Sequence, residues 1–120
     1  MLPKKNRISR REIEVILKNG SRYNSPNLLM YLYKNGKEKK LQNSQFSFSI
    51  SKKISKNAVD RNKQRRRGYS VINKHIDKIK DGYYCMFVFK KGSGSIKYEN
   101  LEKEILELLS ESNVFYPHTK

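Results

Sequence analysis

Residues 51–69 carry too dense a positive charge to be buried, and their sequence is SKKISKNAVDRNKQRRRGY. The cations in this stretch are Lys52, Lys53, Lys56, Arg61, Lys63, Arg65, Arg66 and Arg67. A single Asp60 opposes them, so the stretch repels itself in the folded state unless water or a polyanion neutralises it. The pattern predicts the end of a strand, a short turn and the opening turns of a helix, all at the molecular surface.

The helix that begins in this stretch changes character along its length. Asn57 suits the N-cap and Asp60 suits the positive first turn, so we expect a helix from about Asn57 to Lys80. An apolar stripe recurs at helical spacing in its second half, formed by Tyr69, Ile72, Ile76 and Ile79. Towards the start of the helix, the same stripe continues as Arg65, Asn62 and Ala58. Gly68 lies between the two halves and costs about 1 kcal/mol relative to alanine.

The clearest strand is Gln45–Ser51, where apolar and polar residues alternate. Phe46, Phe48 and Ile50 point to one side of this strand. The other side carries only serines, namely Ser47, Ser49 and Ser51. Small polar side chains leave a groove floor open to a ligand, although an ordinary solvent-facing strand explains the same pattern equally well.

The first helix is predicted to start after Ser9 and to run through Lys18. Glu12 stands three residues after Ser9 and completes a capping box, and Asn19-Gly20 supplies the stop. The apolar residues of this helix are Ile13, Ile16 and Leu17.

The remaining segments add strands and a final helix. Strands are predicted at Arg22–Asn24, Leu28–Lys34 and Tyr83–Phe89, and the last helix at Tyr98–Ser110. We expect Lys34–Ser44 to form a hairpin loop and Lys90–Ser95 a flexible basic loop. The order of helix, strands, helix, strand and helix predicts an α+β sandwich with one mainly antiparallel sheet. We expect a single domain over residues 1–120 with flexible ends at 1–7 and 113–120.

The charge balance limits the class of partner. The chain has 120 residues, with 27 Lys and Arg against 11 Asp and Glu, for a net charge of +16. This excess favours nucleic acid or an anionic membrane as partner. No apolar run is long enough to cross a bilayer and no signal-peptide pattern is present, so we expect no membrane partner. The only cysteine is Cys85, so no disulfide framework exists, and a cytoplasmic location is the simplest expectation.

Residues for protein-borne catalysis do not assemble in the sequence. The histidines are His75 and His118, and neither has an acidic neighbour at metal-ligand spacing. Cys85 lies in an apolar strand and is interpreted as a core residue rather than a nucleophile. Gly92 and Gly94 lack the Lys-Ser/Thr ending of a phosphate-binding loop. We therefore expect no cofactor or metal bound by the protein alone and no catalytic residue on this chain.

The basic helix is better suited to binding RNA than to catalysis. The planar guanidinium of arginine donates two parallel hydrogen bonds to a phosphate. Arg61 and Arg65 are four residues apart, so they share a helix face. Such a like-charged pair destabilises the helix by about a few tenths of a kcal/mol unless its charge is neutralised. An aromatic ring such as that of Tyr31 can stack on an unpaired base.

These residues resemble a known signature. Lys52-Lys53 is followed by Ala58-Val59 and then by the run Arg61-Asn62-Lys63-Gln64-Arg65-Arg66. The run is similar to the Arg-Asn-Arg core and basic pair of the protein subunit of bacterial ribonuclease P. The resemblance extends from about Asn6 to Phe115.

The resemblance implies a fold and a role. Members assist an RNA subunit that carries the catalytic site and its Mg²⁺, and the complex removes the 5′ leader from precursor tRNA. By this resemblance, the residues that dock on the catalytic RNA are Lys52, Lys53, Lys56, Arg61, Asn62, Lys63, Arg65 and Arg66. Those that line a cleft for the single-stranded leader are Ile13, Leu17, Tyr31, Ser47 and Ser49. The family also has a left-handed crossover between the third strand and the last, and no obligate protein partner is expected.

The chain departs from the family pattern at several positions. Lys63 replaces the second signature arginine and keeps its charge without the fork. Gln64 and Arg67 stand where apolar residues are usual, and Gly68-Tyr69 replaces the end of the motif. Ile13 and Leu17 are aliphatic where aromatic residues are frequent.

Two other functions compete with this interpretation. A structural RNA-binding protein of the ribosomal type would have the same charge but no role in processing. A nuclease with its own active site would need carboxylates and histidines that the sequence does not bring together.

Overall fold

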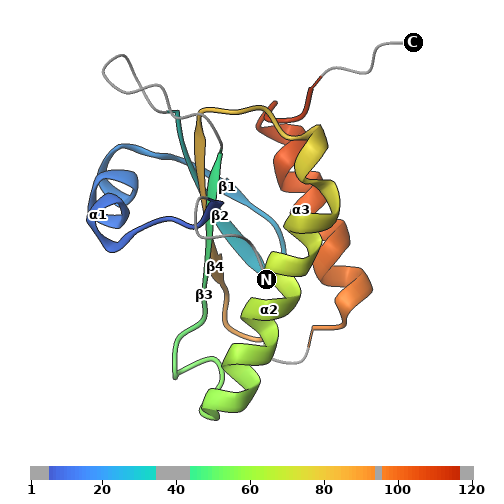
Figure 1. Cartoon of the computed structure of the whole chain (residues 1–120). Helices are drawn as coiled ribbons and strands as arrows, with labels where there is room; N and C mark the ends of the chain where they lie inside the picture. Colours follow the sequence, from blue (N-terminus) through green and yellow to red (C-terminus); the bar gives the residue numbers. More distant parts are fainter. Residues whose placement is uncertain (1–5, 35–43, 94–95, 117–120) are drawn as a thin grey trace.

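The computed structural model describes residues 6–34, 44–93 and 96–116 (Figure 1). Its elements in chain order are α1 (Arg10–Asn19), β1 (Ser21–Asn24), β2 (Leu28–Lys34), β3 (Gln45–Ser49), α2 (Ala58–His75), the 3₁₀ turn η2 (Ile76–Lys78), β4 (Tyr83–Phe89) and α3 (Tyr98–Glu111). The order confirms the α+β fold predicted from the sequence. The central helix ends earlier than expected, because a 3₁₀ turn replaces its last residues.

The sheet is mixed, with the strand order β1-β2-β4-β3. β1 and β4 pair antiparallel with β2, whereas β3 pairs parallel with β4. The expected hairpin between β2 and β3 is wrong, because β4 lies between these strands. The side chains of β4 are buried on both faces, and a strand of that kind belongs in the interior of a sheet. Residues 35–43 of the expected loop lie outside the described residues, and the handedness of the crossover stays a prediction.

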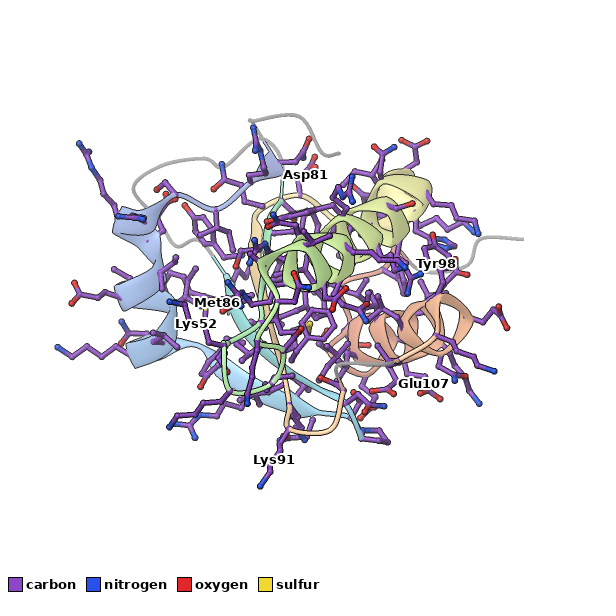
Figure 2. All side chains as sticks on the ribbon, turned by 90° about the horizontal axis from the view of Figure 1, so that it is seen from below. Lys52, Asp81, Met86, Lys91, Tyr98 and Glu107 are labelled. Atoms are coloured by element: carbon purple, nitrogen blue, oxygen red, sulfur yellow. The ribbon has the colours of Figure 1, made fainter. Side chains whose placement is uncertain are left out.

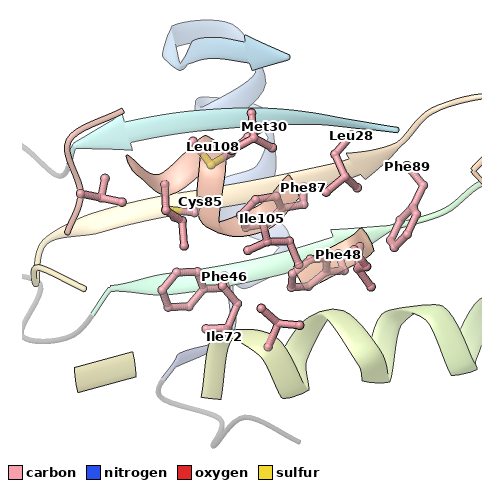
Figure 3. Close-up of a cluster of buried hydrophobic side chains, with 14 of the residues drawn as sticks. Leu28, Met30, Phe46, Phe48, Ile72, Cys85, Phe87, Phe89, Ile105 and Leu108 are labelled. Atoms are coloured by element: carbon pink, nitrogen blue, oxygen red, sulfur yellow. The ribbon is translucent and has the colours of Figure 1, made fainter. Parts of the chain in front are cut away.

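The main core fills the face of the sheet that α2 and α3 cover (Figures 1 and 3). Phe46, Phe48 and Ile50 point into it, as their alternation predicted. The ring of Phe48 stacks on that of Phe87 with centroids 4.8 Å apart, and Tyr69 of α2 meets Phe48 edge-on at 5.1 Å. Burial of these aromatic rings fixes α2 on the sheet.

Helix α1 covers the opposite face of the sheet, so the helices do not all lie on one side (Figure 1). The predicted capping box is confirmed, since the Ser9 N–H donates to the Glu12 carboxylate at 3.2 Å. Ile16 is fully buried in a small cluster with Tyr84 and Met86. The Tyr84 hydroxyl donates to Glu12 at 2.9 Å, and burial together with this bond raises the pKa of Tyr84 to about 12.

Parts of both predicted flexible ends pack on the body of the protein. Asn6 is buried and donates from Nδ2 to the Ser44 carbonyl at 3.1 Å. Val114 is fully buried, and Phe115 forms a β-bridge with Ile79. The flexibility of 1–7 and 113–120 stays a prediction.

A buried carboxylate joins α3 to the turn between β1 and β2. Glu104 is only 7% exposed and accepts hydrogen bonds from the Ser25 hydroxyl at 2.5 Å and from Nδ2 of Asn27 at 2.6 Å. The Asn27 N–H donates to it as well, at 2.8 Å. Burial raises the pKa of Glu104, but these bonds and the nearby Lys90 outweigh burial, so its pKa lies below the ordinary value.

Replacing Glu104 by glutamine is expected to destabilise the protein by about 1.5–3 kcal/mol near neutral pH, because charge-assisted bonds are lost. A lowered folded pKa means that the carboxylate stabilises the fold above its unfolded pKa. That stabilisation is lost as the pH falls through the folded pKa. Urea unfolding from about pH 7 down to about pH 3 should show the two proteins converging at the acid end. Glu107→Gln, an exposed position on the same helix, is the control, and equal curves for it and Glu104→Gln would contradict this account.

Candidate RNA-binding surface

The first half of α2 presents its cations to solvent because its buried side is narrow. Gln64, Gly68, Val71 and Ile72 are the residues of this helix that face the core. Asn62, Lys63 and Arg66 are exposed, whereas Arg61, Arg65 and Arg67 are half-buried. The Asn57 side chain accepts from the Val59 N–H at 2.8 Å, which confirms the predicted N-cap.

Two arginines of α2 are held by hydrogen bonds within the protein. Nη1 of Arg61 donates to the carbonyls of Ser55 at 2.9 Å and Lys56 at 3.0 Å. Arg65 donates to the side-chain oxygen of Asn62. Asn62 and Arg65 line a surface hollow of about 480 Å³ together with Val59, Arg66 and Tyr69. The hollow combines apolar ends with guanidinium groups, a combination suited to a sugar-phosphate chain or a base.

The loop before α2 carries the other predicted cations. Lys52, Lys53 and Lys56 are all exposed. The N–H groups of Ile54 and Ser55 both donate to the Ser51 carbonyl at 3.1 Å, and the Ile54 side chain packs on the main core. The loop therefore holds its lysines next to the start of α2.

The parallel pairing of β3 and β4 adds cations that sequence reasoning missed. Ser49 lies opposite Val88, so the residues after both strands leave the sheet at the same end. Lys91 is exposed there and extends away from the body, at the end that also carries the loop of Lys52 (Figure 2). Lys90 is half-buried and donates to the Ser25 carbonyl at 2.8 Å. In the sequence, these lysines could be noticed only as charges that follow a buried strand. Their position beside the basic loop depends on the parallel pairing, which local sequence patterns do not encode.

The serine side of β3 lies on the sheet face that carries α1. Tyr31 and Ser47 both lie opposite Met86, from the strands on either side of β4. Ser47 is half-buried and Ser49 is exposed, and α1 packs against β2 and β4. Met86 itself is buried, so we call the half-buried and exposed residues of this face, Tyr31, Ser47, Val88 and Ser49, the open sheet face.

The other predicted leader contacts are placed differently from one another. Ile13 packs in the same small cluster as Tyr31, so the structure brings these two together. Leu17 is 45% exposed and lines a separate hollow on α1 with Val15 and Lys18. Arg22, which sequence reasoning missed, lies over the Tyr31 ring at 5.8 Å from its centroid. The sequence showed Arg22 only as a cation on a short strand, and the pairing of β1 with β2 brings it next to Tyr31.

A larger hollow, of about 820 Å³, lies elsewhere. It is bounded by the end of α2, by α3 and by the chain after α3, and it mixes Lys78 and Lys103 with Asp77 and Glu107.

Cys85 is fully buried, and burial raises the pKa of its thiol. Within 6–34, 44–93 and 96–116, no group of three or more His, Cys, Asp or Glu could hold a metal ion. In the same residues, no helix is both long and apolar enough to cross a membrane.

The family model, the similar sequences and the similar solved structures all indicate the same family. A family model described as Ribonuclease P matches residues 2–113. Proteins named ribonuclease P protein component are similar to the chain: that of Rippkaea orientalis is 31% identical over 99% of this chain and 95% of its own length. The protein of Microcystis aeruginosa is 29% identical over 98% of each chain. The solved RNase P protein of Staphylococcus aureus superimposes with a TM-score of 0.80 at 22% identity, over 92% of this chain and 98% of its own.

Proposed function

The chain belongs to the ribonuclease P protein family, and from this premise we propose that it binds the catalytic RNA subunit and the 5′ leader of precursor tRNA. Members of the family are protein components of a tRNA-processing ribonuclease. The proposed role is to assist RNA-catalysed removal of the leader, which forms the mature 5′ end. We place the catalytic site and its Mg²⁺ on the RNA subunit and the complex in the cytoplasm.

One observation supports this role above the others. The exposed cations of α2 and those of the preceding loop form one continuous basic segment, from Lys52 to Arg66. RNA phosphates neutralise such a segment and release counterions, which favours binding strongly at low salt. We assign docking on the RNA subunit to Lys52, Lys53, Lys56, Asn62, Lys63, Arg65 and Arg66, and Arg61 lies in the same segment.

The open sheet face suits a single strand rather than a duplex. The Tyr31 ring offers a surface on which an unstacked base can lie, and Arg22, which lies over this ring, adds a cation. Ser47 and Ser49 leave room for a sugar-phosphate chain and offer hydroxyl groups to it. We propose that the leader lies along this face beside Ile13, with Leu17 at its margin.

Binding specificity tests the proposal against a structural ribosomal role. The protein should bind the ribonuclease P RNA of its own organism more tightly than a ribosomal RNA fragment of equal length. Both affinities should fall with rising salt, because phosphate contacts dominate each of them. The measurement is a titration of both labelled RNAs at several salt concentrations. A preference for the ribosomal fragment would support the ribosomal role instead.

Replacing Tyr31 by alanine is expected to weaken binding of precursor tRNA to the holoenzyme by about 1–3 kcal/mol, the range for loss of one stacked base. Binding of mature tRNA should change little, because it has no leader. Tyr31→Phe keeps the ring and should retain the precursor preference. Holoenzyme affinities for both tRNAs give the comparison, and an equal loss for both would argue against a leader on the open sheet face.

A further inference from the structure

The Arg61 guanidinium bonds the backbone that precedes α2, whereas that of Arg65 bonds the side chain of Asn62 on the same helix. The Nη1 atom of Arg61 donates to two backbone carbonyls, those of Ser55 and Lys56, at 2.9 and 3.0 Å. The residue is half-buried, whereas its neighbours Asn62 and Lys63 are exposed. A guanidinium held in this way spends part of its hydrogen-bonding capacity inside the protein rather than on a ligand.

The two carbonyls belong to the segment that connects the lysine loop to the helix. Ser51–Ser55 forms one turn, closed by the Ile54 and Ser55 N–H groups on the Ser51 carbonyl. The backbone then runs through Lys56 to the N-cap Asn57, which is in the extended conformation. Arg61 lies on the first turns of α2, so its bonds join the rigid helix to the end of this loop.

We infer that Arg61 is a positioning residue, which holds the loop so that Lys52, Lys53 and Lys56 meet the RNA together with the cations of α2. This inference rests on the proposed function and deepens it. The neighbouring loop lysines repel one another, so a loop without an anchor would spread them apart. Ordering them before binding reduces the entropy that RNA binding must otherwise overcome.

Coupling between residues separates this role from a direct phosphate contact. Lys53→Ala should weaken affinity for the ribonuclease P RNA roughly threefold to tenfold in the wild-type background, as for loss of one phosphate contact. In the Arg61→Ala background the same change should cost less than about twofold, because the loop is already displaced. Arg66, which is exposed on α2, provides the matched cycle, and Arg66→Ala with Lys53→Ala should be close to additive.

Hydrogen exchange in the free protein provides the second readout. Arg61→Ala should speed exchange of the Ile54 and Ser55 amides, which close the loop turn, and Arg66→Ala should leave them unchanged. An additive Arg61 cycle with unchanged exchange would overturn the inference and make Arg61 an ordinary phosphate contact. If the wild-type protein fails to bind the RNA, the proposed function fails, and the exchange comparison alone decides whether Arg61 holds the loop.

Discussion

Replacing Arg65 and Arg66 together by alanine is expected to reduce affinity for the ribonuclease P RNA by roughly tenfold to a hundredfold at moderate salt. Both residues line the hollow on α2, and both carry forks that suit phosphate. Each lost phosphate contact also lowers the number of counterions that the RNA releases on binding. The slope of log affinity against log salt should therefore become shallower by about 2 units.

A control with the same change of net charge separates local contacts from the field of the whole protein. Lys78→Ala with Lys103→Ala also removes two cations, but both line the large hollow at the other end of α2. We expect this variant to lose affinity only slightly and to keep its salt slope, as measured in the same titrations. Equal losses in the two double variants would contradict docking through the basic segment.

Replacing Gly68 by alanine is expected to destabilise the fold by about 1–3 kcal/mol, the usual cost of an overfilled core. A Cβ atom at this position would lie 2.6 Å from two carbon atoms of the Phe48 ring. That ring is buried and stacks on Phe87 (Figure 3), and Tyr69 meets it edge-on, so it has little room to withdraw. The helical preference of alanine, about 1 kcal/mol, opposes this cost, so the net loss should lie in the lower part of this range.

Urea unfolding measures this effect against a control on the same helix. Asn73→Ala changes an exposed residue of α2 and should leave the free energy of unfolding within about 0.5 kcal/mol of the wild-type value. A Gly68→Ala variant more stable than the wild type would mean that α2 can move away from the sheet, contrary to the packing described above.

Gly68 also illustrates where sequence reasoning stops. Helix propensity identified a cost at this position, yet the benefit is a close approach of α2 to Phe48 that only the packed structure reveals. Gln64 is similar, because its polar side chain is buried on the side of the helix that faces the core. Propensity describes one residue in a helix, whereas both positions depend on what lies across from them.

Local patterns predicted the elements well because each pattern depends on neighbours in the chain. The alternation of Gln45–Ser51 predicted which residues of β3 are buried, and the capping box at Ser9 predicted the start of α1. The hairpin after β2 failed because strand order depends on burial across the sheet, not on the connecting residues. The same limit hid Lys91 and Arg22, which reach the site only through pairing.

Site prediction followed the same division. Charge density predicted that the cations from Lys52 to Arg66 lie at the surface. The lysines and Arg66 are exposed as predicted, whereas Arg61 and Arg65 are half-buried. The inward bonds of Arg61 could not be predicted, because they depend on the backbone path of Ser55 and Lys56. The family resemblance likewise grouped Ile13 and Leu17 with Tyr31 in the leader cleft, whereas Ile13 packs in the cluster of Tyr31 and Leu17 does not.

The most direct test of the proposed function is cleavage of precursor tRNA by the cognate ribonuclease P RNA at low Mg²⁺, with and without the protein. Cations of the protein should replace part of the Mg²⁺ that the RNAs otherwise need to approach each other. We predict that the protein stimulates cleavage at the mature 5′ end and that the protein without RNA cleaves nothing. Cleavage unchanged by the protein, or cleavage by the protein alone, would contradict its assignment as the RNA-binding subunit of an RNA-catalysed reaction.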